Sequence, residues 1–571
     1  MRVNALNANV RNFAISFNPI RNMQATRIAP MQFDTVSFTA RDEKLLSADE
    51  GMLAAKKLKT STSGYRAKLG DKFNDKFVYS MTNAVANKIQ EEGQLWTVVA
   101  GDTRKATKKY APVISEILKD RGITVLTPQL DGAGKDEISP VASPILALIT
   151  KQYDIPLSVL LTASHNPWDD GGYNFLTDEG AVADDRVVVP LAENLEEITK
   201  KGSPRTPSEH SSLYKYIKAN NIPVDPYAIY KNYLDETKLV DFENIAKADI
   251  DIFYEDFGGT GKYYFPRLLK DNGIEVKGLL SSKTEGPNPS KSNLKNLAQE
   301  VTKSKNPLRI GLATDGDSDR FGVVDENGNF ISAPDVIMLC AYHLIKNKGM
   351  TQGTIVKNHA TSSKIDAVAK YFNDMGYDID VEQTPVGFKY LGGKMIDLEH
   401  SDKPVIVAGE ESGGLTIRNH IPEKDGFVAL STLLDLVATE KKPLGVILSE
   451  INDDLGGDYC TNCINMKFAT EEEKNNAVSS FDKYFNGDIT QIAGFEIDYD
   501  KTYEADKKLR GYKPEGDGTK IYLKNGSSVL IRKSGTEPVM RLYVDAVNEN
   551  IYDKLSNFLV SRVESMGGTI K

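Results

Sequence analysis

The sequence predicts an α/β protein made of three similar domains with mixed sheets, followed by an α+β cap domain at the C-terminal end. One pattern of apolar strand, Gly- or Thr-containing loop, amphipathic helix, Gly stop and second strand occurs at least three times. The last segment instead places the hairpin signal Asn525-Gly526 between alternating strands, and a helical run follows it. The length of 571 residues suits three to four domains of roughly 150 residues each.

The three repeats define the expected sheets. In the first repeat we expect, in order, a strand at 97–100, a helix at 106–119, a stop at Gly122 and a strand at 123–126. The second repeat, IDIFYEDFGGTGKYYFPRLLKDNGIEVKGLL, stops at Gly273, and the third, GTIVKNHATSSKIDAVAKYFNDMGYDIDVEQ, stops at Gly376. Strands separated by such helices need crossover connections, which predicts mixed or parallel sheets with helices on their faces.

Residues 1–41 differ from the rest, because they contain five Arg, a single acidic residue and no Lys. We expect a disordered leader there, and the alternative of an organelle transit peptide is disfavoured by the missing Ser enrichment. The expected domains are 42–210 with a reactive Ser loop, 211–332 with an acidic loop, 333–455 with a Gly-rich acidic loop, and 456–571 as the cap.

Composition excludes several classes of protein. The formal net charge is -10 and no basic stretch could follow a nucleic-acid backbone, which argues against a nucleic-acid partner. No window approaches 18 consecutive apolar residues, so we expect no membrane span. Three cysteines cannot form a disulfide framework, which makes the cytoplasm the expected compartment.

The first chemical loop is TASHNP, directly after the apolar strand LSVLL. The end of a strand is where α/β folds present reactive groups, and Ser164 followed by His165 could be a nucleophile with a polar neighbour. The alternative is a capped turn, in which Ser164 and Asn166 bond only to nearby backbone. The loop is not a serine-hydrolase elbow, because the flanking Gly residues are absent.

The second loop is DGDSDR, which places Asp315, Asp317 and Asp319 two residues apart. Three such carboxylates in one turn repel each other unless a cation lies between them, and Mg²⁺ prefers hard oxygen ligands. An EF-hand would use the same residues with Glu326, but it needs Gly where this chain has Arg320. A solvated acidic turn is the other alternative.

The third loop is GEESGG, whose Glu410 and Ser412 could bind vicinal sugar hydroxyls. The nearby segment HIPEKDG supplies His420 and Lys424 as candidate phosphate or hydroxyl contacts, and the alternative is a loop joined to a helix cap.

The fourth loop, RKSGTEP, combines a guanidinium, hydroxyls and backbone N–H groups in a candidate phosphate cradle. Its candidate contacts are Arg532, Ser534, Gly535, Thr536 and Arg541. Walker A is excluded both here and at GGTGKYY, where Tyr263 occupies the Ser/Thr position.

These four loops, in this order on three α/β units and a cap, resemble the α-D-phosphohexomutase superfamily from about residue 45 onward. The resemblance implies that Ser164 is the phosphoserine, with Arg320 beside it. The implied metal ligands are Ser164, Asp315, Asp317 and Asp319. The implied sugar loop contains Glu410 and Ser412, and the implied phosphate loop contains Arg532, Ser534, Gly535 and Thr536.

Two shorter motifs fit the same resemblance. STSGYR is similar to a family loop that places Arg66 near the phosphoserine, and TPVGFK to one that offers Lys389 to the site. The chain departs from the family at GGYNF, where Asn174 replaces an expected lysine. Asn cannot act as a general base, so proton handling would pass to His165 or Lys389.

The resemblance implies the interconversion of hexose 1-phosphate and hexose 6-phosphate, with Mg²⁺ and with glucose 1,6-bisphosphate as activator and intermediate. Glucose is the expected sugar because GEESGG and HIPEKDG look more like the phosphoglucomutase branch than the phosphoglucosamine one. Phosphomannomutase activity remains an alternative, since the two sugars differ at one hydroxyl. The expected partners are small hexose phosphates, and the chain is expected to be a monomer or homodimer.

Other functions also remain open. A phosphoserine-dependent sugar-phosphate phosphatase would need the same Ser164 and Mg²⁺ but no sugar-reading loop. A non-catalytic binding protein would keep its ligand affinity without Ser164. The pair Cys460 and Cys463 could suggest zinc or redox chemistry, but no second pair or suitably spaced His accompanies it.

Overall fold

The computed structural model describes residues 45–61, 64–134, 137–202, 222–457, 459–485, 489–499, 518–534 and 538–571. The expected leader at 1–41 lies outside these residues. The described chain forms two compact units, of which the first runs to Tyr233 and the second starts at Leu234, with residues 60–62 counted in the second. Among the described residues, no helix is long and apolar enough to cross a membrane.

The first unit is built on a six-stranded sheet with the order β1-β5-β4-β2-β3-β6. Its strands are β1 (Tyr65–Lys68), β2 (Trp96–Gly101), β3 (Thr124–Pro128), β4 (Leu157–Leu161), β5 (Asp170–Thr177) and β6 (Ile222–Val224). Strand β5 is antiparallel to β4 and to β1, whereas β4, β2, β3 and β6 are parallel. This sheet therefore includes β6, which lies beyond the expected end of the first domain at residue 210.

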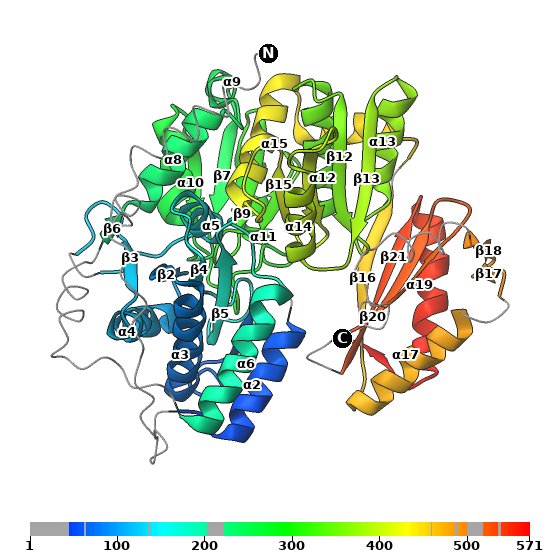
Figure 1. Ribbon diagram of the computed structural model, residues 1–571. Coiled ribbons are helices and arrows are strands. Elements are labelled where there is room, and N and C mark those ends of the chain that lie inside the picture. The colour runs from blue at the N-terminus through cyan, green and yellow to red at the C-terminus, as the bar shows by residue number, and fades with distance from the viewer. Residues whose placement is uncertain are drawn as a thin grey trace. The chain divides into compact units, whose positions relative to one another are not determined.

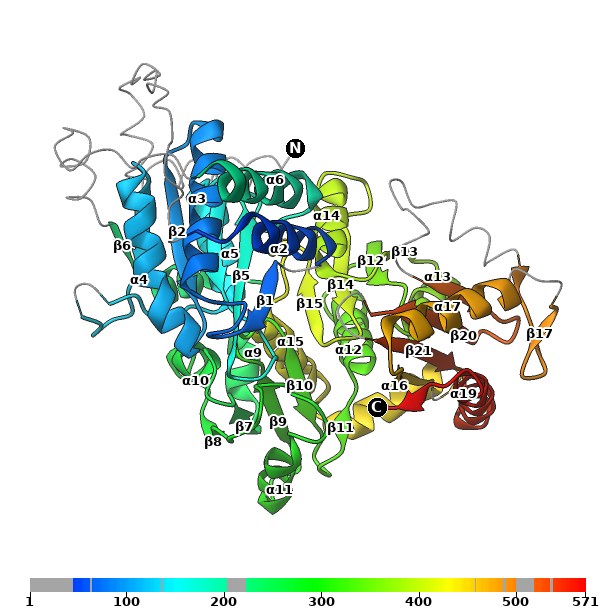
Figure 2. The same cartoon turned by 90° about the horizontal axis from the view of Figure 1, so that it is seen from below.

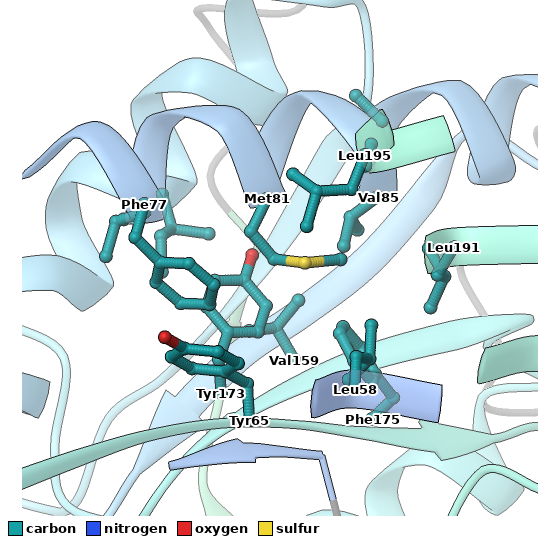
Figure 3. Packing of buried hydrophobic residues seen from close by; sticks show 14 of the residues in the cluster. Leu58, Tyr65, Phe77, Met81, Val85, Val159, Tyr173, Phe175, Leu191 and Leu195 are labelled. Carbon is teal, nitrogen blue, oxygen red and sulfur yellow. The ribbon is translucent and has the colours of Figure 1, made fainter. Parts of the chain in front are cut away.

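One face of this sheet packs against four helices. These are α2 (Ala48–Thr60), α3 (Asp75–Glu92), α4 (Lys105–Asp120) and α6 (Asp185–Lys201), and their buried side chains form one cluster with the strands. Figure 3 shows Met81 of α3 close to Leu195 of α6 above the strand residue Phe175, and Phe77 of α3 beside Tyr65. Helices α2 and α6 lie side by side in both views (Figures 1 and 2). Helix α5 (Ser143–Gln152) lies outside the cluster and contacts β4 and β5.

Helix α8 (Pro226–Thr237) contains the boundary between the two units at Tyr233 and Leu234. The second unit continues with helix α9 (Phe242–Lys247) and a five-stranded sheet with the order β11-β10-β9-β7-β8. The strands are β7 (Asp251–Glu255), β8 (Val276–Leu280), β9 (Arg309–Thr314), β10 (Phe321–Val324) and β11 (Phe330–Ile331). Helices α10 (Gly261–Asp271) and α11 (Lys295–Lys303) pack against it.

A four-stranded sheet follows, with the order β13-β12-β14-β15. Its strands are β12 (Gln352–Asn358), β13 (Asp378–Thr384), β14 (Val405–Glu410) and β15 (Gly414–Ile417). Its helices are α12 (Ala333–Lys346), α13 (Lys364–Asp374), α14 (Phe388–Leu398), α15 (Gly426–Glu440) and α16 (Leu444–Asp454). Helix α15 also joins this sheet to the preceding one, because the Phe427 ring stacks on Phe265 of α10 at 5.7 Å.

The three sheets share one topology. Each has a parallel pair joined by a crossover helix, namely β2 with β3, β7 with β8 and β12 with β13. A third parallel strand lies on the other side of the first, and an antiparallel strand follows it. The three expected Gly stops have positive φ, at 81° for Gly122, 76° for Gly273 and 91° for Gly376, where glycine carries no Cβ penalty. The predicted fold class is confirmed.

The C-terminal cap contains an antiparallel sheet with the order β19-β20-β21-β16-β22 and a two-stranded ribbon. The strands are β16 (Cys460–Lys467), β17 (Gln491–Ile492), β18 (Phe495–Glu496), β19 (Thr519–Tyr522), β20 (Ser528–Lys533), β21 (Val539–Ala546) and β22 (Thr569–Ile570). Helices α17 (Glu471–Phe485) and α19 (Glu549–Glu564) cover one face (Figure 1). Cys460 and Cys463 lie three residues apart on β16 and so point to opposite faces, which does not suit joint metal binding.

The other face of the cap sheet contacts the end of β12 and the start of α13. The Asp545 carboxylate accepts hydrogen bonds from Ser362 Oγ at 2.6 Å, Ser363 N at 2.8 Å and Thr461 Oγ1 at 2.5 Å. Since these donors come from both sides of the joint, Asp545 fixes the cap to the N-terminal turn of α13. A carboxylate is favourable there because a helix N-terminus carries partial positive charge.

A second set of contacts lies further along the same joint. Lys520 Nζ of β19 donates to the His359 carbonyl oxygen at 2.6 Å, and Tyr522 OH donates to Gln383 Oε1 at 2.8 Å. The His359 side chain is buried, and its Nδ1 lies 3.3 Å from Gln383 Oε1. Burial and the charge of Lys520 lower the pKa of His359 to about 4. This imidazole is therefore neutral at the joint near pH 7.

We expect His359→Gln to flatten the acid side of the stability profile. The unfolded chain binds a proton at His359 below pH 6.5, whereas the folded protein does so only near the lowered pKa, so folding stability falls as the pH drops through this interval. Between pH 7.5 and 5.5 the variant should lose about 1 kcal/mol less than the wild type in urea unfolding. The exposed His400, changed to Gln, is the control. Equal pH slopes in wild type and His359→Gln would contradict this prediction.

Candidate active site

Three of the four chemical loops occupy the same position in the three similar sheets. Each connects the third parallel strand to the antiparallel strand, between β4 and β5, between β9 and β10, and between β14 and β15. The carboxyl ends of parallel strands are where α/β folds place ligands and reactive groups. Each sheet therefore presents one chemically distinct loop at an equivalent point.

Ser164 lies in the β4–β5 loop in a left-handed backbone conformation, with φ of 51° and 1% exposure. Its Oγ is 3.2 Å from His165 Nδ1, and its backbone N donates to Thr162 Oγ1 at 2.8 Å. A left-handed non-Gly residue costs about 1–3 kcal/mol and persists only where its surroundings fix it. The loop thus holds a serine hydroxyl beside an imidazole, as the sequence predicts.

Arg104 and Asp102 belong to this site but were not found by the sequence analysis. Arg104 is 1% exposed, and its Nη2 donates to the carbonyl oxygens of Asn166, at 2.7 Å, and Ser164. Its Nε pairs with Asp102 Oδ2 at 2.9 Å. Their signal in the sequence was the segment Asp-Thr-Arg directly after strand β2, at the end of the strand that neighbours β4.

Arg66 and Asn174 lie on the strands beside the serine loop. Arg66 of β1 is paired with Gly172 of β5, and a Cβ at Gly172 would lie 1.8 Å from the Thr162 carbonyl oxygen, so β5 passes directly against the loop. Asn174 is buried, and its Nδ2 donates to the carbonyl oxygens of Thr162 at 2.8 Å and Leu160 at 3.3 Å. Asn174 therefore supports the backbone of the loop.

The β9–β10 loop brings one carboxylate oxygen each of Asp315, Asp317 and Asp319 within 4.8 Å of one another. Their exposed fractions are 0%, 2% and 6%, which excludes the solvated acidic turn. The EF-hand is excluded as well, because strands and not helices flank the loop. Three buried hard oxygen donors fit a divalent ion such as Mg²⁺.

Two cations neutralise part of this negative charge. Lys424 Nζ lies 2.5 Å from Asp319 Oδ2, and Arg320 Nε lies 3.9 Å from Asp319 Oδ1. Burial opposes the charge of both cations, yet the carboxylates of Asp319 and its neighbours raise the pKa of Arg320 and of Lys424 above their ordinary values. Both cations therefore stay charged, and three carboxylates still exceed two cations.

The β14–β15 loop, which is the candidate sugar loop with Glu410 and Ser412, is hydrogen-bonded to the acidic loop. Ser412 Oγ donates to Glu410 Oε1 at 2.5 Å, which aligns the two candidate hydroxyl contacts. Phe321 N donates to the Gly413 carbonyl oxygen at 2.9 Å, and Arg320 Nη1 approaches the Ser412 carbonyl oxygen at 3.4 Å. The metal-binding and sugar-reading candidates therefore form one site within the second unit.

The segment HIPEKDG lies against both loops. Gly414 leaves room for Lys424, whose Cδ would lie 2.2 Å from a Cβ at that position. His420 Nε2 lies 2.9 Å from Asp425 Oδ2, and Asp425 accepts from Phe427 N at the start of α15. The structure thus places His420 behind a helix cap, and its substrate-binding role stays a prediction.

Lys389 lies near the start of α14, on the helix that meets this segment. A Cβ at Gly392, one turn further on, would lie 2.3 Å from the Pro422 carbonyl oxygen. Lys424 Nζ is 5.7 Å from the ring centre of Phe388, the neighbour of Lys389. These contacts place the start of α14 against the HIPEKDG segment, and the role of Lys389 in the reaction stays a prediction.

The phosphate cradle is described in part. Arg532 of β20 and Arg541 of β21 are direct partners in the sheet and therefore point to the same face. Ser534 is fixed through its backbone, because its N donates to Val539 O and its carbonyl oxygen accepts from Lys474 Nζ, both at 2.8 Å. Gly535 and Thr536 lie outside the described residues.

GGTGKYY has a structural role that its Gly pattern did not reveal. Thr260 N donates to the Gly316 carbonyl oxygen at 2.9 Å, and Thr260 Oγ1 lies 2.8 Å from Ser318 Oγ. A Cβ at Gly259 would lie 2.8 Å from the same Gly316 oxygen, so only Gly fits so close to the acidic loop. This segment supports the carboxylates from behind.

Four family models match the chain in order. The models of phosphoglucomutase/phosphomannomutase alpha/beta/alpha domains I, II and III match residues 57–203, 230–328 and 333–454, and the model of the C-terminal domain matches 472–560. The chain belongs to the phosphoglucomutase/phosphomannomutase family. This confirms the resemblance to the α-D-phosphohexomutase superfamily.

Similar proteins in the family carry several substrate names. The phosphomannomutase of Mycoplasma genitalium is 26% identical over 511 residues, covering 85% of this chain and 87% of that protein. The phosphoglucosamine mutase of Ruminiclostridium cellulolyticum is 25% identical over 478 residues, covering 82% and 92%. The open form of parafusin, a phosphoglucomutase from Paramecium, has a TM-score of 0.69 at 20% identity, covering 89% and 94%. The expectation of a phosphohexomutase, an isomerase, is confirmed.

Asp317→Asn should weaken Mg²⁺ binding at least about tenfold, because it removes one of three converging charges. The same change should raise the melting temperature of the metal-free protein, since it relieves repulsion between buried like charges. Calorimetric Mg²⁺ titration and thermal melts after EDTA treatment measure both effects. Asp271→Asn, an exposed change on α10, is the control. A wild-type affinity for Mg²⁺ in Asp317→Asn would rule this loop out as the metal site.

Proposed function

We propose that this phosphohexomutase interconverts glucose 1-phosphate and glucose 6-phosphate, with a phosphoserine at Ser164 and glucose 1,6-bisphosphate as intermediate. The observation that carries the proposal is the hydrogen bond from Phe321 N to the Gly413 carbonyl oxygen. This bond joins the end of the acidic loop to the candidate sugar loop. A phosphatase would need the carboxylates but gains nothing from a hydroxyl-reading loop fixed to them. Phosphomannomutase activity is the alternative, because the same loop could read either epimer.

Asp315, Asp317 and Asp319 would hold Mg²⁺, with the Ser164 phosphate as the predicted further ligand. Bound there, Mg²⁺ supplies charge neutralisation for the transferring phosphoryl oxygens. Arg320 adds a second positive charge that the surrounding carboxylates keep protonated. Because the site offers preorganised charges, the protein stabilises the transferring phosphoryl group without solvent rearrangement.

His165 would handle the proton at Ser164 Oγ. Its Nδ1 lies 3.2 Å from that oxygen, so it can donate a proton as the phosphoryl group leaves and accept one when the group returns. Asn174 occupies the position where the family resemblance implies a lysine, and its amide donates to the loop backbone. For the substrate hydroxyl, we assign the proton to Lys389, near the start of α14.

The cap would hold the phosphate that is not reacting. Arg532 and Arg541 share one face of the cap sheet, and a paired guanidinium surface binds phosphate oxygens in either substrate orientation. Glu410 and Ser412 would bind sugar hydroxyls from the loop fixed to the metal site. Three free cysteines favour the cytoplasm, where hexose phosphates are available; we retain a monomer or homodimer as the expected state.

A coupled assay with glucose 1-phosphate and mannose 1-phosphate tests the substrate. We expect a higher kcat/KM for glucose 1-phosphate, and formation of hexose 6-phosphate should greatly exceed release of inorganic phosphate. A preference for the mannose epimer would select the alternative activity. Phosphate release without isomerisation would identify a phosphatase and reject the mutase proposal.

Ser164→Ala should lower isomerisation at least about a thousandfold, because it removes the acceptor of the phosphoryl group. The purified wild-type protein should also carry phosphate on Ser164, measured by intact-protein and peptide mass spectrometry. Ser158→Ala is a matched control, since Ser158 is a buried serine on the strand that leads to the loop and its hydroxyl bonds to Thr150. Near-normal turnover in Ser164→Ala would refute the phosphoserine assignment.

A further inference from the structure

We propose that Arg104 is a positioning residue that fixes the backbone of Ser164 and thereby sets the direction of its hydroxyl. The proposal rests on the proposed function, because it assigns how the nucleophile of that reaction is held. It concerns contacts within the first unit alone. Arg104 donates to backbone carbonyl oxygens of the serine loop, so its action passes through the loop backbone.

The Arg104 guanidinium binds three backbone carbonyl oxygens of the serine loop. Nη2 donates to the carbonyl oxygens of Ser164 and of Asn166, the latter at 2.7 Å, and Nη1 donates to that of Pro167. The Trp168 ring lies 5.0 Å from the guanidinium carbon. A planar fork of donors matches such converging carbonyls, whereas a lysine ammonium could not reach all three with the same geometry.

Asp102 connects the Arg104 guanidinium, through Thr162, to the backbone N–H of Ser164. Its Oδ2 accepts from Arg104 Nε at 2.9 Å and from Thr162 Oγ1 at 2.7 Å. Thr162 Oγ1 in turn accepts from Ser164 N at 2.8 Å. The carbonyl of Ser164 is therefore held by Arg104 directly, and its N–H by the chain from Arg104 through Asp102 and Thr162.

These bonds explain how Ser164 keeps an unfavourable backbone conformation. Its φ of 51° is costly for a residue with a side chain, and the peptide groups on both sides of it are fixed by the Arg104 network. With both peptide planes fixed, Cβ has one direction, and Oγ lies next to His165 Nδ1. The Arg104–Asp102 pair brings no net charge, so its contribution to turnover is geometric.

The test compares Arg104→Met with Arg121→Met, a change at another buried arginine of the same unit. Arg121 is 4% exposed and donates to Asn83 Oδ1 at 2.9 Å, Asn87 Oδ1 at 2.7 Å and Gln90 Oε1 at 2.8 Å. Both changes remove a buried guanidinium and its hydrogen bonds, but Arg104 donates to carbonyl oxygens of the serine loop, whereas Arg121 donates to side chains of α3. Melting temperature, kcat and KM are measured for the full-length variants.

Arg104→Met should lower kcat about a hundredfold and change KM less than about threefold, because a misplaced nucleophile slows transfer without loosening substrate binding. Arg104→Lys should fall between this variant and the wild type. Arg121→Met should keep kcat within about threefold even where it melts as early as Arg104→Met. Equal kcat in the two Met variants at matched melting temperature would overturn the proposal.

If Arg104→Met fails to fold, Thr162→Val decides the question. It removes the hydroxyl between Asp102 and Ser164 N and should lower kcat about tenfold, and Thr162→Ser should restore most of that loss. A wild-type kcat in Thr162→Val would overturn the proposal.

Amide hydrogen exchange separates this proposal from the proposed function. Exchange in residues 162–168 should be faster in the Arg104 variants than in Arg121→Met, while exchange in β2 and β4 stays slow. Unchanged exchange in the loop would overturn the positioning role, whatever the activity. A wild-type protein without mutase activity would instead refute the proposed function and leave the exchange result to decide the role of Arg104.

Discussion

Repulsion between three buried carboxylates is the constraint on which the second unit depends. Asp315, Asp317 and Asp319 are held within 4.8 Å of one another and out of water, an arrangement that is unfavourable unless cations surround it. The chain meets this need with Lys424 and Arg320. Lys424 in turn requires Gly414 opposite it, because a Cβ there would lie 2.2 Å from Lys424 Cδ. The acidic loop thus constrains which residues can occupy positions about 100 residues further along the chain.

The three equivalent loops are held by different means. The serine loop is bound by a buried guanidinium from the neighbouring strand, and the acidic loop is supported by Thr260 at the start of α10. The candidate sugar loop is supported by Thr361, whose Oγ1 accepts a hydrogen bond from Glu411 N at 3.1 Å. In each case the supporting residue follows the first strand of the repeat. One topology therefore supplies both a reactive loop and, from the adjacent strand end, the residue that fixes it.

The sequence predicted the elements that depend on local signals. The repeats, the Gly stops and the Asn525-Gly526 hairpin were predicted because apolar periodicity and glycine conformation act over a few residues. Contacts between distant residues were not predictable in this way. Arg104 bonds carbonyls about 60 residues away, and His420 turned out to contact a helix cap. Side-chain type alone suggested a ligand for His420, whereas its burial against Asp425 depends on the folded chain.

The cap joint connects the sheet that carries the candidate phosphate contacts to the domain that carries the candidate sugar loop. Asp545 at one end of the cap sheet provides attachment to α13, while Arg532 and Arg541 occupy a different part of the same face. Burial and the charge of Glu410 raise the pKa of Glu411, and the Arg532 charge opposes that shift. Arg532 is therefore one of the charges that act on Glu411 in the candidate sugar loop. If the cap binds phosphate at Arg532 as proposed, the bound anion would offset part of that positive charge and would favour the protonated form of Glu411.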